Sequence, residues 1–499
     1  MKAHTRSAPA GHRFKFIGLH IDLRIQVMPF AALCREVREA ARMGINTLLI
    51  EWEATFPFRR HAMISNAFAY TPEEIEKFIS LCSRLGIQVI PLQQCFGHVE
   101  YILRHSPYAS LRESRRNLPQ VCPKNEAAME LFTEIFQEIA AAHPSPYMHI
   151  GGDETPFLGH CPKCEAKVRE VGKSALYVGY LRRISERVIA MGKTPLVWAD
   201  MLLLHPEAAA SMPKETIFID WNYGRPVDQG GDPARLRDLK FRMWGAPAMR
   251  SGPDNHWLAC WHKHFMNLRD YVPYTKSMGF EGIVLTSWST LGVYGIEWDS
   301  WTTVREMFPI DRRYPHAGFR ILQAAFIAAV SGGTPLDPEA FVTDYAQERF
   351  GLGGKSARRL WRALTLGEAE AVANNWAAAR KPAAEARRIL HALQPRRNIR
   401  EFSHLRLMAD LRDHHIRFRL AELACFSHPR PPSPRVVAKL LPPLLAEARQ
   451  LQRRFAALNK GAIHSGEMPL EEEYRFGGIR KLNARLGRTG RTGGKTHTR

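Results

Sequence analysis

The sequence lacks any apolar stretch long enough to span a membrane. Its 499 residues are 45% hydrophobic and 24% charged, which is ordinary for a globular protein and sufficient for one large domain with an appendage. No window approaches the roughly 20 apolar residues of a transmembrane helix, and residues 1–15 lack the apolar core of a signal peptide. These absences favour a cytoplasmic protein with no membrane partner.

Cysteine is also scarce, at 8 residues, which excludes a dense disulfide scaffold. Cys161 and Cys164 form the one CxxC pair of the sequence, and no second pair completes a zinc site. Further ligands would have to come from His160, Cys122 or Cys95. We therefore expect no cofactor and no metal, with a metal at Cys161 and Cys164 as the weaker alternative.

Acidic residues number 49 against 70 basic ones, which gives a formal net charge of +21. Such a charge bears on solubility and on association with polyanions, and alone it does not predict a nucleic-acid partner. Part of the excess lies in residues 481–499, where arginine and lysine stand among glycine and threonine. That composition predicts a basic disordered tail.

Short apolar runs alternate with amphipathic stretches from Phe16 to Val330, a pattern typical of parallel strands joined by crossover helices. The helices between the strands often end at a glycine. Eight such units in about 300 residues predict an α/β fold, a (β/α)8 TIM barrel with its active site at the carboxyl ends of the strands. The predicted strands are 17–23, 47–51, 88–92, 147–150, 194–199, 216–221, 241–244 and 282–287, and predicted helices include 29–43, 72–85, 125–142 and 174–191.

Beyond residue 335 the strand signals fade, and alanine, leucine and arginine at helical spacing dominate. The proline-rich run 428–434 predicts a break between helical blocks. Three roles stay open for this α-helical C-terminal domain: a cover for the active site, a homodimer interface, or a shield for the barrel's flank. The predicted domains are a flexible N-terminus at 1–15, a catalytic barrel at 16–333, the helical domain at 334–480 and the tail at 481–499.

The fourth predicted strand ends in HIGGDET, which begins at His149 and contains the adjacent carboxylates Asp153 and Glu154. Side chains alternate faces along an extended chain, so these two carboxylates are expected to have different roles. The glycines before them permit close approach of the backbone to a ligand. A glycine turn followed by an acidic helix cap is the alternative interpretation.

Other predicted strand ends carry aromatic and acidic residues together. Aromatic faces stack on the C–H side of a pyranose while carboxylates bind its hydroxyls, so the combination favours a sugar site. A single tryptophan would more often fill a core. The residues concerned are Asp22, Glu51, His98, Trp198, Asp200, Trp221, Tyr223, Trp244 and Trp288.

The chain resembles the β-N-acetylhexosaminidases of glycoside hydrolase family 20, and within them the hexosaminidase D-like subgroup. The resemblance covers residues 16–307 and is carried by HIGGDE at 149–154, LIEWEATFPF at 49–58, QCFGHVEY at 94–101, LVWADM at 196–201 and GIVLTSW at 282–288. Ile17 stands where the wider family usually has an arginine, and Gln94 where it usually has an aspartate. We interpret both departures as features of the subgroup.

The resemblance implies a retaining exo-β-N-acetylhexosaminidase that removes terminal non-reducing β-GlcNAc or β-GalNAc by substrate-assisted catalysis through an oxazolinium ion. It implies Glu154 as general acid and base, Asp153 as partner of the 2-acetamido nitrogen, and Tyr223 as donor to the acetamide oxygen. As substrate-binding residues it implies Trp198, Trp221, Trp244 and Trp288 around the acetamide, with Asp22, Glu51, His98, His149 and Asp200.

Two hypotheses from other classes stay open. One is a non-catalytic carbohydrate-binding barrel with a basic surface, although a binding protein has no need of the paired carboxylates Asp153 and Glu154. The other is a metal-dependent enzyme that uses His160, Cys161 and Cys164.

Overall fold

A computed structural model of the chain describes residues 13–492 apart from 205, 227–230, 291, 302–303, 309 and 427–433. The described residues form two compact units. The first contains 13–251, 266–311 and 326–336, and the second contains 252–265, 312–325 and 337–492. None of the described helices is both long and apolar enough to cross a membrane.

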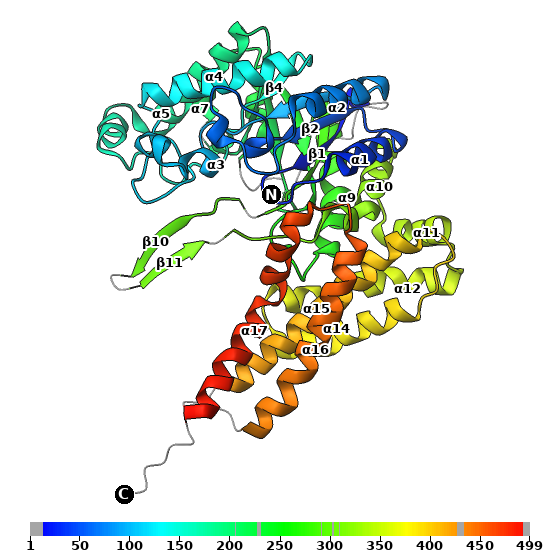
Figure 1. The fold of residues 1–499 in the computed structure, drawn as a ribbon. Helices are drawn as coiled ribbons and strands as arrows, with labels where there is room; N and C mark the ends of the chain where they lie inside the picture. Colours follow the sequence, from blue (N-terminus) through cyan, green and yellow to red (C-terminus); the bar gives the residue numbers. More distant parts are fainter. Residues whose placement is uncertain are drawn as a thin grey trace, which may run out of the picture. The chain divides into compact units, whose positions relative to one another are not determined.

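The first unit is built on a closed barrel of eight parallel strands (Figure 1). Hydrogen bonds between the first and last barrel strands close it, with Phe16 opposite Gly282 and Leu19 opposite Leu285. The predicted (β/α)8 barrel is therefore confirmed, and each predicted strand overlaps an observed one. The barrel strands are β1 (Phe16–Asp22), β2 (Thr47–Glu51), β3 (Gln88–Leu92), β4 (Tyr147–His149), β5 (Thr194–Trp198), β6 (Ile217–Trp221), β7 (Arg242–Ala246) and β9 (Gly282–Ser287).

Three further strands lie outside the predicted set. A short strand, β8 (Ala248–Arg250), pairs in parallel with the end of β9. The strands β10 (Ile296–Trp301) and β11 (Val304–Phe308) form an antiparallel pair after the last barrel strand. The strand–helix alternation that predicts a barrel contains no signal for such inserts, because they interrupt a connection and do not continue the repeat.

The helices of this unit follow local sequence signals. In α2 (Pro72–Arg84), Thr71 caps the amino terminus: its hydroxyl accepts from the Glu74 N–H at 3.2 Å while the Glu74 carboxylate accepts from the Thr71 N–H at 3.0 Å. The other helices are α1 (Phe30–Arg42), α3 (Glu100–Leu103), α4 (Glu126–Ala142), α5 (Pro162–Ala190), α6 (Asp200–Leu204), α7 (Pro206–Ala209) and α8 (Pro233–Asp238), while α9 (Trp261–Ser277) and α10 (Arg320–Ser331) contribute to both units.

Helix α5 starts well before its predicted beginning at Ser174. Its first part is mostly exposed and carries little apolar periodicity, so the pattern from which the helix was predicted is absent there. Gly172, at φ 82° and ψ 162°, interrupts the helical backbone between the two parts. The early start places Cys161 at the N-cap and Cys164 in the first turn.

The second unit is helical, which agrees with the predicted C-terminal helices (Figure 1). Within it α14 packs on α15, α15 on α16 and α16 on α17. The predicted break at 428–434 lies almost entirely outside the described residues, as do residues 493–499 of the predicted tail, whereas 481–492 are helical. The helices are α11 (Pro338–Phe350), α12 (Gly354–Thr365), α13 (Glu368–Val372), α14 (Trp376–Ala392), α15 (Ile399–Phe426), α16 (Pro434–Leu458) and α17 (Met468–Thr492).

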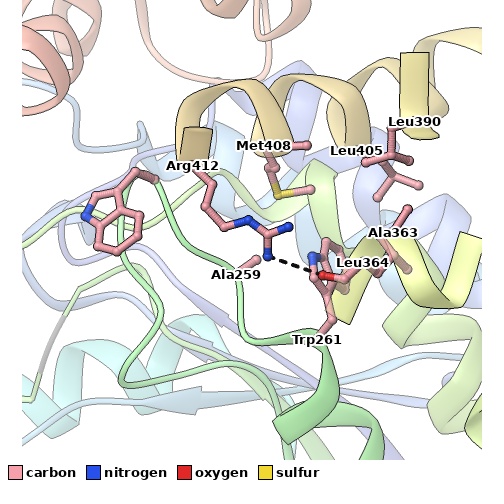
Figure 2. A pocket seen from close by; sticks show the side chains of 10 residues that line it. Ala259, Trp261, Ala363, Leu364, Leu390, Leu405, Met408 and Arg412 are labelled. Atoms are coloured by element: carbon pink, nitrogen blue, oxygen red, sulfur yellow. Dashed lines mark hydrogen bonds between the residues drawn. The ribbon is translucent and has the colours of Figure 1, made fainter. Parts of the chain in front are cut away.

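A small pocket in this unit contains a buried arginine. Figure 2 shows the Arg412 guanidinium between Met408 and Trp261, and it donates to the Leu364 carbonyl oxygen at 3.4 Å. Burial lowers the pKa of Arg412, although the carboxylates of Glu368 and Asp413 act in the opposite direction. The pocket belongs to the packing of the helical unit.

The barrel interior is filled by apolar side chains from most of the barrel strands, which makes it a packed core. Trp244 is fully buried, with its ring stacked on Phe16 at 4.6 Å between centroids. Its strand neighbour Gly282 leaves room for the indole, because a Cβ atom there would lie 2.6 Å from Trp244 Cδ2. The contact is possible only while position 282 has no side chain.

We predict that Gly282→Ala destabilises the barrel by about 1–3 kcal/mol, the usual cost of overpacking a core. Gly179→Ala is the matched control: Gly179 lies inside α5, and a methyl group added there would have nothing within 4 Å, so alanine should be neutral or stabilising by up to about 1 kcal/mol. Thermal and urea unfolding of both variants measures the difference. Equal stability of the two variants would contradict this account of the barrel core.

Candidate active site

The segment after β4 presents the two adjacent carboxylates differently. Asp153 is buried, with 6% of the residue exposed, whereas the Glu154 side chain is 42% exposed. Gly151, Gly152 and Glu154 all have positive φ, at 74°, 99° and 40°. This unusual backbone turns one carboxylate inward and leaves the other accessible, as the expectation of different roles requires.

A histidine from the neighbouring strand joins the pair. His98 follows β3, and its Nε2 lies 3.2 Å from Asp153 Oδ2 and 3.4 Å from Glu154 Oε2. Gly97 permits this approach, because a Cβ atom there would lie 2.3 Å from the Asp153 carbonyl oxygen. The parallel neighbours β3 and β4 thus bring residues separated by more than 50 positions into one contact.

The charges of this trio depend on one another. Burial acts to lower the pKa of His98, but the carboxylates of Asp153 and Glu154 raise it well above its ordinary value. Burial acts to raise the pKa of Asp153, and the nearby His98 ring lowers it overall. An imidazolium therefore lies between an ionised buried aspartate and an accessible glutamate.

Aromatic side chains from three further strand ends lie near the trio. The Trp198 ring lies 4.4 Å from His149 and 5.9 Å from Trp288, between centroids. The Trp288 indole donates to the Tyr223 hydroxyl at 2.9 Å, and the Tyr223 ring stacks on Trp221 at 5.0 Å. Burial raises the pKa of Tyr223, so its hydroxyl keeps its proton.

Several polar atoms here are buried without a hydrogen-bond partner in the described part of the chain. They are Asp153 Oδ1, His149 Nε2 and Trp198 Nε1. Such atoms are rare in native proteins and call for an explanation such as a ligand or water. Their concentration around one end of the barrel indicates a polar ligand site.

The first two strands add a buried ionic network. The Asp22 carboxylate accepts from Arg24 and from both the N–H and the hydroxyl of Ser289, at 2.7 and 2.8 Å. Burial acts to raise the pKa of Asp22, but Arg24 and His20 hold it well below its usual range. Glu51 contacts the His20 ring at 3.2 Å, and the Arg24 guanidinium lies over Trp288 at 5.1 Å.

Asp200, which starts α6 directly after β5, completes the site. Its carboxylate accepts from the Glu154 N–H at 3.5 Å. Burial, with the carboxylates of Asp153 and Glu154 nearby, raises the pKa of Asp200 to about 7. Near neutral pH part of the population is protonated, which limits the negative charge around Glu154.

Residues 47–232 match the family model of the glycosyl hydrolase family 20 catalytic domain. Over 312 residues the chain is 28% identical to hexosaminidase D of Bos taurus, which covers 58% of this chain and 87% of that protein. Hexosaminidase D of Homo sapiens is 28% identical over 346 residues, 65% of this chain and 67% of that protein. Over residues 47–232 the chain is therefore similar to the family 20 catalytic domain, and this match together with the two hexosaminidase relatives supports a glycosidase.

Solved structures show the same fold. The β-N-acetylhexosaminidase from Bacteroides fragilis superposes with a TM-score of 0.51 at 14% identity, over 67% of this chain and 70% of that one. The chitobiase of Flavobacterium johnsoniae superposes with a TM-score of 0.52 at 16% identity, over 96% of this chain and 73% of that one. Both superpositions show the (β/α)8 barrel fold.

Most predicted residues of the family 20 site lie in one connected network, and Trp244 does not. Its ring contacts Phe16 and Tyr147, the first residues of β1 and β4, so it lies toward the amino-terminal end of the barrel interior. Trp244 therefore fills core and is removed from the substrate-binding set. The two parts of the network are linked by the electrostatic interaction between His149 and Asp153. The predicted residues in it are Asp22, Glu51, His98, His149, Asp153, Glu154, Trp198, Asp200, Trp221, Tyr223 and Trp288.

The sequence analysis did not predict two residues of this network, His20 and Arg24. A signal for them exists, because His20, Asp22 and Arg24 alternate along and just beyond an otherwise apolar first strand. Residues two apart share a face of a strand, so three polar residues at this spacing indicate a polar cluster. Arg24 lies just beyond the carboxyl end of the first strand, whereas Ile17 lies near the start of that strand.

We predict that His98 stays protonated and His149 stays neutral at about pH 7.5, one unit above the ordinary histidine pKa. Burial lowers the pKa of His149 to about 3, while that of His98 is raised. Nitrogen-15 NMR of histidine-labelled protein distinguishes the two forms, with His98→Gln and His149→Gln assigning the signals. A neutral His98 at this pH would remove the imidazolium from the site.

The contact of His98 with Asp153 and Glu154 also makes the stability of the folded protein depend on pH. Because the folded-state pKa of His98 is raised, its stabilising contribution is complete below the unfolded pKa of about 6.5 and is lost as pH rises through the folded value. The difference in melting temperature between wild type and His98→Gln should therefore be largest in mildly acidic solution and shrink at alkaline pH.

Proposed function

We propose that the protein is a retaining exo-β-N-acetylhexosaminidase that uses the substrate's own acetamide as nucleophile. The observation that carries this proposal is the contact of His98 with both the buried Asp153 and the accessible Glu154. Two carboxylates with different exposure suit two different tasks at one scissile bond. The names of the bovine and human relatives support the substrate class.

In the first step Glu154 acts as general acid. It gives its proton to the glycosidic oxygen, the aglycone leaves as an alcohol, and the acetamide carbonyl oxygen forms a bond to the anomeric carbon. In the second step the Glu154 carboxylate takes a proton from water, and the water oxygen attacks the same carbon and opens the oxazolinium ring. Two inversions leave the anomeric configuration retained.

Asp153 suits the role of stabilising the positive charge that develops on the acetamide. It is ionised and buried, and its Oδ1 has no hydrogen-bond partner among the described residues, so that atom is available to accept from the acetamide N–H. Tyr223 has a complementary role. Its hydroxyl oxygen accepts a hydrogen bond from the Trp288 indole, so the hydroxyl proton points away from Trp288. We propose that this proton is donated to the acetamide oxygen. Both groups are held in place before the substrate arrives.

The remaining polar groups divide between sugar binding and positioning. The Asp22 carboxylate already accepts from Arg24 and Ser289, so we assign Asp22 to positioning Arg24. The guanidinium of Arg24 then offers donors to the sugar hydroxyls. Glu51 and Asp200 are the carboxylates left for hydroxyl contacts.

We predict that Glu154→Gln lowers kcat by about 100- to 10,000-fold, the usual contribution of general acid–base catalysis. The loss should be larger for an alkyl glycoside than for a 4-nitrophenyl glycoside, because nitrophenolate leaves with little help from an acid. Paired β-GlcNAc and β-GalNAc substrates give the preferred epimer, and a β-glucoside without the acetamide is the blank.

Asp220→Asn is the matched control for this experiment. Asp220 is a buried carboxylate of β6 that accepts from the Tyr271 hydroxyl at 2.6 Å and lies outside the proposed machinery. It should keep wild-type kcat. Wild-type protein that binds N-acetylhexosamine and cleaves none of the substrates would favour the carbohydrate-binding barrel.

We predict that a thiazoline analogue of the cyclised intermediate binds at least about 100-fold more tightly than free N-acetylhexosamine, since transition-state mimics gain at least that much. Asp153→Asn and Tyr223→Phe should remove most of the gain while they change binding of the free sugar little. Inhibition constants for both ligands provide the test. Equal affinity for the two ligands would refute the substrate-assisted route.

A further inference from the structure

A cluster of three thiols and one carboxylate lies beside the catalytic segments. It consists of Glu113, Cys122, Cys161 and Cys164, whose ligand atoms all lie within 4.8 Å of one another. The Cys122 sulfur is 3.5 Å from the sulfurs of both Cys161 and Cys164. Of the further ligands that the sequence suggested, the structure brings in Cys122, whereas His160 and Cys95 are not part of the cluster.

These distances suit a tetrahedral metal centre. Zinc–sulfur bonds of about 2.3 Å in a tetrahedron place neighbouring sulfurs about 3.8 Å apart, close to the observed 3.5 Å. A disulfide would bring two sulfurs to about 2.05 Å. Three thiolates with one carboxylate oxygen are donors that zinc accepts.

The carboxylate of Glu113 gives independent evidence that a ligand binds at this cluster. The residue is 3% exposed, and its Oε1 accepts from the N–H groups of Gly159 and Cys161 at 3.1 Å. Its Oε2 is buried without a hydrogen-bond partner in the described chain. A buried carboxylate held in place by two backbone donors beside three thiols has the form of a metal ligand with its supporting contacts.

The local backbone prepares the two cysteines of the CxxC pair. Cys161 is the N-cap of α5, and its sulfur accepts from the Cys164 N–H at 3.4 Å. On the other side, an antiparallel bridge between Arg112 and Val121 pairs the segment that carries Glu113 with the segment that carries Cys122, and the Glu113 N–H donates to the Gln120 carbonyl oxygen at 3.0 Å.

We propose that Glu113, Cys122, Cys161 and Cys164 bind one structural zinc ion. The site joins the connection after β3, which carries His98, to the connection after β4, which carries Asp153 and Glu154. A direct hydrogen bond already links the two connections, since Gln120 Oε1 accepts from the Phe157 N–H at 2.8 Å. The zinc ion crosslinks the segments that position the catalytic trio, and takes no part in the reaction.

The first test is the metal content of the full-length protein, purified under reducing conditions, offered zinc and passed over a chelating resin. We expect about one zinc per chain, and the same value for two controls. Cys34→Ser removes a buried thiol outside the cluster, and His160→Ala removes the residue next to Cys161. Cys161→Ser, which alters the most exposed of the three thiols, should lose the zinc and lower the melting temperature.

A second measurement uses only wild-type protein, so it tests the proposal even if the cysteine variants fail to fold. Wild-type protein stripped of zinc with a chelator and given cobalt(II) should show the intense near-ultraviolet charge-transfer absorption of cobalt–thiolate bonds, and zinc should displace it. Thermal stability should fall on stripping and recover with zinc. Both readouts are independent of glycosidase activity, so they stand whether or not the proposed reaction is correct.

Three results would overturn the proposal. One is wild-type protein that holds no zinc and gives no cobalt absorption. Another is zinc that stays bound in Cys161→Ser and in Cys122→Ser. The third is a thiol titration of denatured, unreduced protein that finds two fewer than the eight thiols of the chain, which would assign the cluster to a disulfide.

Discussion

The hydrogen bonds between β1 and β9 are the constraint on which the rest of the site depends. They pair Phe16 to Leu19 with Gly282 to Leu285 and so convert a parallel sheet into a barrel. In a closed parallel barrel every strand ends on the same rim. Asp22 of the first strand and Ser289 after the last therefore meet through two hydrogen bonds, although 267 positions separate them.

On that rim the dominant interaction is electrostatic. Several carboxylates gather in a mostly buried volume, and each would be costly without a compensating cation or proton. The His98 imidazolium balances the negative charge of Asp153 and Glu154, and the Arg24 guanidinium balances that of Asp22. Asp200 has a raised pKa, so part of its population is protonated and uncharged near neutral pH. The arrangement leaves Asp153 ionised and Glu154 accessible, which are the states that the proposed reaction needs from its two carboxylates.

The connections that carry these groups are long and irregular, so they need support of their own. Tyr177 and Tyr180 of α5 donate to the carbonyl oxygens of Gly152 and Cys95, one in each connection. The cluster around Cys122 lies farther along the same two connections. If it holds zinc, helix α5 supports the catalytic segments through its tyrosines and through the metal ligands at its start.

The sequence by itself determined the eight barrel strands and the HIGGDE segment, because strand periodicity and the glycines before Asp153 are local properties. It also indicated most residues of the candidate site, since residues that follow parallel strands share one rim. Only the tertiary structure decided how far along the barrel axis each side chain lies and which side chains it contacts on other strands. Trp244 follows the same pattern as Trp198 yet lies toward the opposite end of the interior, and the place of Glu113 in the thiol cluster became visible only through its partners. The physical reason is that a strand's sequence specifies which face a side chain takes, whereas the register between strands sets its height and its neighbours.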